Sequence, residues 1–365
     1  MSSTNTEILF ILHLPPPVHG AAMVGQYINE SHIINSTFQC RYINLAMAGN
    51  MEDIGKVSLA KVGALFRILV SIRREMKRKP NLVYVTPNAC GSAFYKDFLV
   101  VELIKFWGGK VVLHFHNKGV EKNSRSKINN YLYKLFFRNA KIVLLSKVLY
   151  PDFQKFVKED DVYYCPNGIP EIETKARTHH PICRILFLSN LIISKGLLDL
   201  LDACKILLDR NLAFKCDIVG AETDEMSQTR LEQEIRNRGL ASNVEYLGKK
   251  YGEEKNECFD NSDIFVFPTY YPNECFPIVL LEAMQHGLPC VSTDEGAIPD
   301  IIDDGKTGIV VQRHNPNSIA NAIQPLIESE SLRKEMGNAA RSKYDKFYRL
   351  DTFEQQLSAI LRQLV

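Results

Sequence analysis

The sequence lacks any uninterrupted apolar stretch close to the ~20 residues that a membrane-spanning helix requires, so it predicts no transmembrane segment. The apolar run near its start, in MSSTNTEILFILHLPPP, is as short as a strand and follows no basic residue, which argues against a secretion signal. We therefore expect a cytoplasmic protein.

Paired cysteines and acidic clusters are also missing. The nine cysteines include no C-x-x-C pair, and several lie inside apolar runs, where reduced core thiols are typical. No aspartate-rich metal motif is present either. We therefore expect no disulfide framework, no structural zinc, no catalytic metal and no other cofactor.

The small net charge of +2 hides an asymmetry along the chain. Residues 1–170 carry 22 Lys and Arg against 12 Asp and Glu, whereas residues 171–365 carry 22 against 30. The basic first part predicts an anionic surface or substrate on that side. Nucleic acid is not expected as the anion, because the basic residues are not interleaved with aromatic residues as on a stacking platform.

The length of 365 residues predicts two α/β domains, since a single core of ordinary size is shorter. Apolar strand-like runs alternate with helical runs, which predicts parallel sheets covered by helices on both faces. A Pro/Gly turn, PNGIP, predicts the boundary between domains 1–168 and 169–344. Strands are expected at Glu7–Leu14, Phe38–Leu45, Asn81–Thr86, Lys110–Phe115, Lys141–Leu145, Asp161–Cys165, Arg184–Ser189, Phe214–Gly220, Asn243–Gly248, Asp263–Pro268 and Leu288–Thr293.

The most informative stretch runs from Asp263 to Val311. A strand closed by a proline is followed by a loop and by an apolar helical run over Pro277–His286, and a second strand comes next. Glu274 lies in the loop and Glu282 in the second turn of the helix. Both acids therefore belong to the carboxyl end of a sheet, where a helix N-terminus can bind a phosphate.

Two motifs in this stretch carry a family resemblance. They read E-C-F-P-I-V-L-L-E-A-M-x-x-G-L-P-C-V-S-T and G-A-I-P-D-I-I-x-D-G-x-T-G, and they resemble the donor-binding core of the retaining glycosyltransferases of family 4. The sequence departs from the commoner pattern at Cys275 and Pro277, where glycines are frequent. Pro277 removes one N–H that could face the donor.

The resemblance implies the GT-B fold: two doubly wound, Rossmann-like parallel-sheet domains that face each other across a cleft. The second domain binds most of the nucleotide sugar, and the final helix, within 345–365, packs back on the first domain. The resemblance assigns Glu282 to the ribose hydroxyls and Glu274 to the transferred sugar. The amides around Phe276, Pro277, Ile278 and Val279 would contact the diphosphate. The alternatives are an acid that favours the helix dipole for Glu274 and a solvent-facing residue for Glu282.

Lys195 precedes a helix expected to begin near Gly196, where a cation opposes the helix dipole, so a local anion would explain it. In the resembling family an arginine and a lysine before this helix bind the donor diphosphate. Lys195 matches the lysine, but Asn190 replaces the arginine and can only give a neutral hydrogen bond. This departure keeps a catalytically silent, nucleotide-sugar-binding subunit as an alternative.

Two residues of the first domain complete the expected site. His116 follows a strand at its carboxyl end and matches the family's active-site histidine, whereas His114 lies within the strand and is expected to pack. Gly20 matches the glycine loop between donor and acceptor, or simply forms a tight turn.

The helical run from Lys56 to Lys79 ends in a basic cluster that includes Arg73, Arg74 and Arg78. It is either a solvated helix end, favoured by the dipole, or a peripheral contact with the anionic inner face of the cytoplasmic membrane.

These observations predict a retaining hexosyltransferase. Its donor would be a UDP- or GDP-sugar, and its acceptor a saccharide or a lipid-linked saccharide in the synthesis of a cell-surface polysaccharide such as lipopolysaccharide or capsule. A GT-B epimerase or phosphorylase and the silent subunit are the alternatives.

Overall fold

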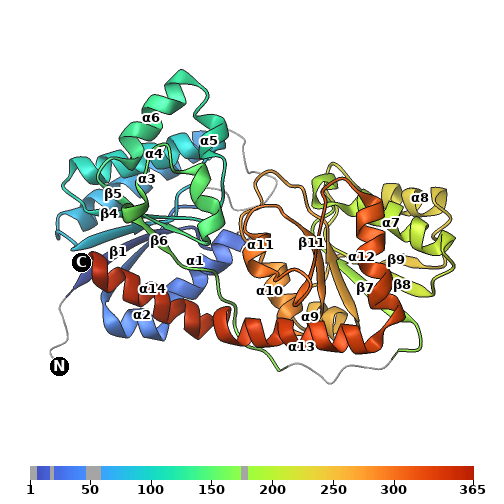
Figure 1. The fold of residues 1–365 in the computed structure, drawn as a ribbon. Helices are drawn as coiled ribbons and strands as arrows, with labels where there is room; N and C mark the ends of the chain where they lie inside the picture. Colours follow the sequence, from blue (N-terminus) through green and yellow to red (C-terminus); the bar gives the residue numbers. More distant parts are fainter. Residues whose placement is uncertain (1–5, 17–19, 47–58, 174–179) are drawn as a thin grey trace. The chain divides into compact units, whose positions relative to one another are not determined.

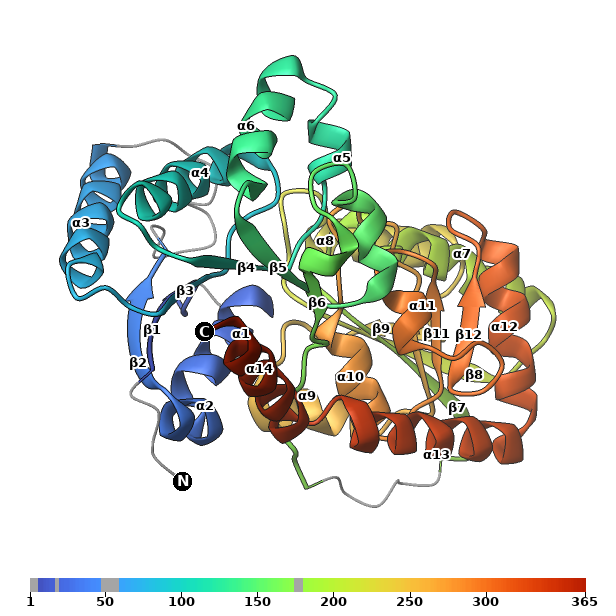
Figure 2. The ribbon, with the colours of Figure 1, turned by 60° about the vertical axis from the view of Figure 1, so that its left-hand side comes forward.

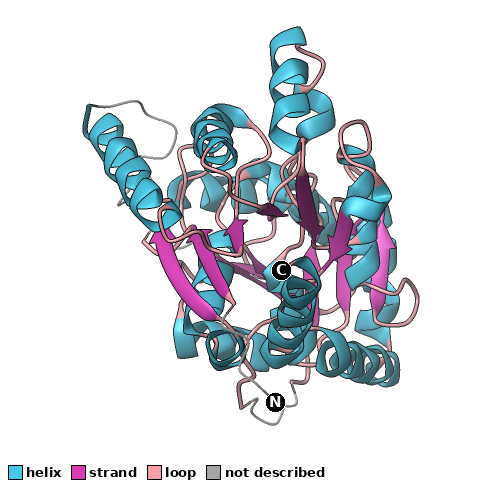
Figure 3. Cartoon of the chain, turned by 90° about the vertical axis from the view of Figure 1, so that its left-hand side faces the viewer, coloured by secondary structure: helices cyan, strands magenta, loops and turns pink. Residues whose placement is uncertain are grey.

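The computed structural model describes residues 6–16, 20–46, 59–173 and 180–365. The chain divides into two compact units, and Figure 1 shows the elements of each. Unit 1 comprises residues 1–168 and 350–365, and unit 2 comprises residues 169–349. Helices flank the strands in both units (Figure 3).

Unit 1 contains a six-stranded sheet in the order β2-β1-β3-β4-β5-β6, and all neighbouring strands are parallel. The β1, β3, β4 and β5 strands are buried along nearly their whole length, as expected for continuous apolar runs covered on both faces. The predicted parallel sheet is confirmed. Its strands are β1 (Glu7–Leu12), β2 (Gln39–Asn44), β3 (Leu82–Val85), β4 (Val111–Phe115), β5 (Ala140–Leu144) and β6 (Val162–Tyr164).

The helices of unit 1 cover both faces of this sheet. Figures 1 and 2 show α3, α4 and α6 on one face and α1, α2 and α14 on the other. The last helix, α14, therefore packs against α2 within unit 1, and it begins at residue 350 rather than 345. The bounds are α1 (Gly20–Glu30), α2 (His32–Thr37), α3 (Leu59–Met76), α4 (Gly91–Phe106), α5 (Val120–Asn123), α6 (Lys127–Phe137) and α14 (Leu350–Leu364).

The sequence also predicts a helix over Pro151–Val157, and this prediction is wrong. The chain there forms a 3₁₀ segment, η2 (Lys147–Asp152), followed by turns. Pro151 lies inside this segment, and a proline both lacks the N–H for an i→i−4 bond and disfavours helical backbone before it. A second 3₁₀ turn, η3 (Glu159–Asp161), precedes β6.

Unit 2 contains a second parallel six-stranded sheet, in the order β12-β11-β10-β7-β8-β9. Its first strand, β7, lies between β8 and β10, so the order of the strands reverses between β7 and β10. In open α/β sheets, ligands bind at the carboxyl ends of the strands at such a switch point. The strands are β7 (Cys183–Leu188), β8 (Phe214–Val219), β9 (Val244–Tyr246), β10 (Ile264–Phe267), β11 (Cys290–Thr293) and β12 (Gly308–Val311).

The helices of unit 2 pack in pairs on the sheet: α7 contacts α12, and α10 contacts α13. The 3₁₀ turn η4 (Ile193–Lys195) connects β7 to α7. The bounds are α7 (Leu197–Asp209), α8 (Gln228–Asn237), α9 (Gly252–Asp260), α10 (Ile278–Gln285), α11 (Ile298–Ile301), α12 (Pro316–Glu328) and α13 (Glu330–Phe347).

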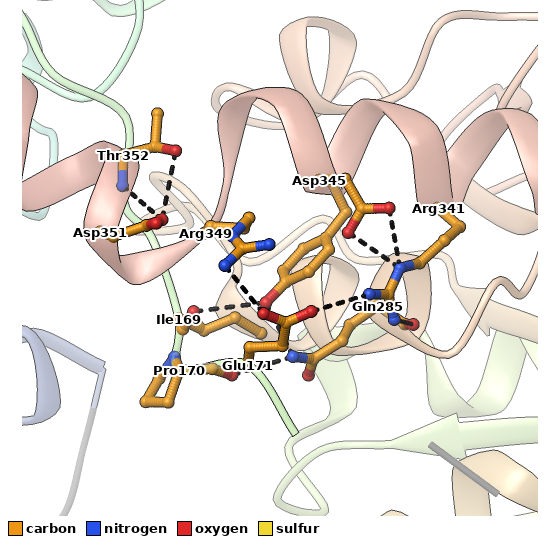
Figure 4. A network of polar contacts seen from close by, with 10 residues as sticks. Ile169, Pro170, Glu171, Gln285, Arg341, Asp345, Arg349, Asp351 and Thr352 are labelled. Carbon is orange, nitrogen blue, oxygen red and sulfur yellow. Dashed lines mark hydrogen bonds and ion pairs between the residues drawn. The ribbon is translucent and has the colours of Figure 1, made fainter. Parts of the chain in front are cut away.

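A polar network holds the first and last residues of unit 2 side by side (Figure 4). Arg341 and Arg349 both pair with Glu171, at 3.2 and 2.8 Å. The Tyr344 hydroxyl donates to the Ile169 carbonyl at 3.3 Å, and Ile169 forms a parallel bridge with Arg349. The two points where the chain enters and leaves unit 2 are therefore fixed to each other by charge-assisted and backbone bonds.

Candidate functional site

Lys195 and Glu274 meet at the switch point of the unit 2 sheet. Lys195 ends η4, just after β7, and Glu274 lies in the loop after β10. Because β7 and β10 are parallel neighbours, their following loops leave the sheet side by side. The Lys195 Nζ lies 2.6 Å from the Glu274 Oε2, which is a charge-assisted hydrogen bond.

This ion pair is largely enclosed by other groups of the same edge. The side chains of Lys195 and Glu274 are only 15% and 10% exposed. The Lys195 Nζ lies 4.5 Å from the ring centroid of Tyr271 and 5.5 Å from that of Phe267, within the range of cation–π attraction. The Thr269 hydroxyl donates to Glu274 at 3.4 Å. The ammonium group is therefore held at one point, ready to contact an anion.

Two glycines bring the loops of this pair close to neighbouring backbone. Gly196, with φ +87°, follows Lys195, and a Cβ there would lie 2.1 Å from the Pro268 carbonyl oxygen. Gly296, with φ +59°, lies against the other loop, where a Cβ would be 2.5 Å from the Glu274 carbonyl oxygen. Only glycine fits either position, because both the space and the left-handed backbone exclude a side chain.

The Glu274 loop leads directly into α10. Pro277 occupies the N-cap with extended backbone, φ −69° and ψ 113°, so it precedes the first helical turn in which it was expected. Phe276 is buried, and Ile278 and Val279 are half-buried. Pro277 gives no side-chain cap, and the N–H groups of a first turn have no partner within their own helix. An anion can therefore bind at this end.

Glu282 lies in the second turn of α10, as predicted, but it does not join Lys195. Its Oε1 lies 2.6 Å from the Nζ of Lys255, a residue of α9. Glu282 and Lys255 are 22% and 25% exposed, so the pair remains accessible to solvent. The two predicted acids thus belong to two separate Lys–Glu pairs.

Sequence reasoning gave no role to Lys255. It lies in a helix of ordinary composition, GEEKNECFD, and its proximity to Glu282 results from how α9 and α10 sit on the sheet. No local signal relates Lys255 to the motif that contains Glu282.

The remaining residues predicted for the site are separate from these pairs. Asn190 is exposed in the loop after β7, where its carbonyl accepts from the Ile192 N–H at 2.7 Å. Cys275 is buried beside Glu274, at 4% exposure. In unit 1, Gly20 is exposed at the first position of α1.

His116, also in unit 1, follows β4 directly and is half-buried. Its ring centroid lies 4.4 Å from that of His114. His114 is fully buried within β4, where it hydrogen-bonds the Tyr84 hydroxyl, in agreement with the expectation that it packs. Burial lowers the pKa of His114 well below its usual value, so its imidazole stays neutral.

Neither a metal centre nor a membrane-spanning helix is found in the part of the chain that the structure describes. Among residues 6–16, 20–46, 59–173 and 180–365, no three His, Cys, Asp or Glu side chains are grouped so that they could hold a metal ion. Within the same described part of the chain, no helix combines the length and hydrophobicity needed to cross a bilayer.

Two doubly wound parallel sheets in one chain define the GT-B fold, and comparison with solved structures agrees. The chain superposes on the crystal structure of Anabaena Alr3699/HepE in complex with UDP and glucose, with a TM-score of 0.72 over 98% of this chain and 100% of the other. The two sequences are 16% identical, so this likeness concerns the fold.

The sequence comparison is more specific for unit 2. Residues 173–343 match the family described as "Glycosyl transferases group 1". The chain is 35% identical over 159 residues to the D-inositol 3-phosphate glycosyltransferase of Corynebacterium jeikeium (strain K411), covering 42% of this chain and 37% of that protein. It is 30% identical over 190 residues to the amylovoran biosynthesis glycosyltransferase AmsK of Erwinia amylovora, covering 51% and 46%. The matched regions thus span less than half of these two relatives.

Proposed function

We propose that the protein is a retaining glycosyltransferase that moves a hexose from a UDP- or GDP-sugar to a saccharide or lipid-linked saccharide during the synthesis of a cell-surface polysaccharide. The observation that carries this proposal is the 2.6 Å pair of Lys195 and Glu274 at the switch point of unit 2, beside the N-terminus of α10. A cation, a carboxylate and free helix N–H groups are what a sugar bound to a diphosphate needs.

In the proposed reaction, the donor diphosphate takes the place of Glu274 on the Lys195 ammonium. The leaving group gains negative charge as its bond to the sugar breaks, and Lys195 together with the first-turn amides near Phe276, Ile278 and Val279 stabilises that charge. Glu274, released from Lys195, accepts hydrogen bonds from the sugar or steadies the positive charge at its anomeric carbon. The acceptor oxygen forms the new bond to that carbon, and its proton passes to the departing phosphate oxygen. No step of this scheme requires a metal.

The other residues have supporting roles in the proposal. Glu282, kept in place by Lys255, accepts hydrogen bonds from the ribose hydroxyls, since an ionised carboxylate is an acceptor only. His116 orients the transferred sugar, and the loop at Gly20 contacts the donor. Asn190 gives the diphosphate a neutral hydrogen bond where the resembling family has an arginine.

The comparisons support the proposal at the level of class. The family matched by unit 2 consists of glycosyl transferases, AmsK is named for amylovoran biosynthesis, and the Anabaena protein of the same fold was crystallised with UDP and glucose. They leave the base, the hexose and the linkage open to experiment.

The first experiment is a thermal-shift panel with UDP-, GDP- and ADP-sugars, because a ligand that binds only the folded protein raises its melting temperature. The active donor is then tested for transfer or hydrolysis. We expect Glu274→Ala to lower turnover at least about 10²-fold while the melting shift by the nucleotide persists. Glu245→Ala, which changes an exposed glutamate of β9, is the matched control and should leave turnover unchanged.

A catalytically silent nucleotide-sugar-binding subunit is the second candidate, and Asn190 favours it because only one fixed cation remains. Under that alternative the wild-type protein would show a thermal shift but would not turn over any donor. An epimerase would instead convert the nucleotide sugar without releasing nucleotide, which chromatography of the products detects.

We also propose that the protein acts at the cytoplasmic face of a membrane. The end of α3 supports this, because Arg73, Arg74 and Arg78 are exposed there, as are the nearby Lys77 and Lys79. Basic side chains of this kind bind anionic headgroups. Reversing the charges of the three arginines should reduce co-sedimentation with anionic vesicles.

A further inference from the structure

A basic groove lies in unit 1, and none of the residues assigned above to the donor lines it. It has a volume of about 670 Å³ and runs between the edge strand β2 and the helix α3. On the helix side it is lined by Arg67, Ser71, Arg74 and Arg78, whose spacing of four, three and four residues puts them on one face. Arg41 lines it from β2.

The groove holds more positive charge than its own acids balance. Glu75, 13% exposed, is paired with Arg41 at 2.9 Å, Arg74 at 3.5 Å and Arg78 at 3.6 Å. Arg41 also reaches Glu7 at 3.5 Å. Arg67 has no ionic partner among the residues that the structure describes. Among the described residues, four guanidinium groups thus face two carboxylates, which leaves a surplus of two positive charges.

This surplus and its geometry fit a phosphate group. A phosphate monoester carries a charge near −2, and guanidinium groups offer pairs of N–H donors that match its oxygens. Ser71 adds a hydroxyl donor on the same side. A ligand with a single carboxylate would neutralise only one of the two surplus charges. Glu75 already offers a carboxylate to the same arginines.

Apolar side chains beside the arginines indicate where the phosphate comes from. Phe66 and Val70 are 67% and 53% exposed. Each precedes a groove residue by one position, so together they form the adjacent stripe of α3. A phosphate site bordered by exposed apolar groups suits a lipid headgroup better than a freely soluble ester.

We propose that the groove between β2 and α3 is a phosphate-binding site, occupied by the phosphate of an anionic membrane lipid. This proposal specifies the membrane contact proposed above. Only the assignment of the phosphate to a lipid depends on that contact, whereas the phosphate site itself does not. The site differs from a diffuse basic surface because it depends on the four groove arginines and not on the total charge of the helix.

The test compares two double variants of the full chain that lose the same charge from unit 1. Arg67→Ser/Arg74→Ser changes the groove, and Arg125→Ser/Lys134→Ser changes exposed residues outside it. Calorimetry measures binding of inorganic phosphate and of dihexanoyl phosphatidate, and co-sedimentation measures binding to phosphatidylcholine vesicles with or without phosphatidate. All four changed residues are exposed, and melting curves verify that both variants fold.

We expect the groove variant to bind dihexanoyl phosphatidate and phosphatidate vesicles about tenfold more weakly, while the control variant binds them nearly as the wild type does. If the groove variant binds only inorganic phosphate more weakly, and all three proteins bind vesicles equally, the groove is a phosphate site but its ligand is a soluble phosphate. That result would overturn the lipid assignment. Equal weakening in both variants, or none in either, overturns the site. Donor turnover, measured in parallel, tests the transferase proposal separately, because the groove can bind phosphate whether or not any sugar is transferred.

Discussion

The two sheets follow the same topological rule, but the side chains at their switch points differ. In unit 2, Lys195 pairs with Glu274 at the edge, and both charges retain some exposure. In unit 1 the order of the strands reverses between β1 and β3, where Asn88 lies 3.4 Å from the His13 Nε2. The carboxylate of that edge, Asp97, is fully buried. It accepts from the Asn88 amide at 2.8 Å and pairs with Lys96, whose side chain is 9% exposed, at 2.8 Å.

This difference shows how one fold prepares two kinds of surface. At the unit 2 edge an ammonium and a carboxylate can exchange partners with an incoming charged ligand. At the unit 1 edge the carboxylate is fully buried and already bound by an amide and by Lys96, so it is not accessible to a ligand. The first arrangement favours a diphosphate, and the second favours hydroxyl-rich, uncharged ligands.

The largest expected effect on the difference between the two switch points comes from disturbing the turn that carries Lys195. Gly196→Ala forces a Cβ toward the Pro268 carbonyl oxygen and requires φ +87° from an L-residue. We expect the free energy of unfolding of unit 2 to fall by about 3 kcal/mol, measured by urea denaturation. Donor binding should weaken as well.

Gly63→Ala is the control for that substitution. Gly63 lies within α3, and a Cβ there would have no heavy atom within 4 Å. Replacing a helical glycine with alanine should stabilise unit 1 by about 0.5–1 kcal/mol. Equal, small effects of the two substitutions would mean that the turn does not fix Lys195.

The two Lys–Glu pairs of unit 2 can be separated by kinetics. Lys195→Met should lower kcat about 10²-fold, since the diphosphate that Lys195 binds gains further negative charge in the transition state. Lys255→Met should instead raise the KM of the donor about tenfold with little change in kcat, because Glu282 loses the charge-assisted bond that orients it toward the ribose in both states.

Lys334→Met is the matched control for both lysines. Lys334 forms an ion pair with Glu330 at 2.6 Å, but it is 67% exposed on α13. Exposed i,i+4 pairs contribute about 0.3–0.5 kcal/mol to stability. Neither residue of this pair belongs to the proposed donor site. If Lys255→Met changed kcat as strongly as Lys195→Met, the separation of roles between the pairs would be wrong.

The fold followed from sequence where local patterns decide it. Continuous apolar runs such as that of β10 are long enough and well enough bounded to be identified as buried strands. β12 was not predicted, because its four residues begin at Gly308 and their strand character comes from pairing with β11. The parallel sheets and most helices therefore needed only periodicity, whereas a short edge strand needed its neighbour.

The site was predictable in part. Glu274 and Lys195 stand out individually, by a motif and by an unfavourable position relative to a helix dipole. Their meeting depends on β7 and β10 being neighbours, which is a property of the sheet order. Lys255 could not be found at all, since its partner Glu282 is reached only through the packing of two helices.

The smallest effect concerns the buried imidazole of unit 1. Burial lowers the pKa of His114 well below its usual value, so the folded protein keeps His114 neutral while the unfolded chain binds a proton below about pH 6.5. The stability that depends on neutral His114 is therefore present above pH 6.5 and is lost as the pH falls through and below that value. Between pH 7.5 and 5.5 this loss should amount to about 1 kcal/mol of unfolding free energy.

His114→Phe tests this dependence on pH. The variant should be less stable than the wild type at both pH values, because the Tyr84 hydroxyl loses its buried partner, but its stability should decline less between pH 7.5 and 5.5. His32→Gln, at the exposed first position of α2, should leave the decline unchanged. Urea denaturation followed by a signal from unit 1, such as the fluorescence of the single tryptophan Trp107, measures both. An unaltered decline in His114→Phe would show that the acid sensitivity of unit 1 comes from other groups.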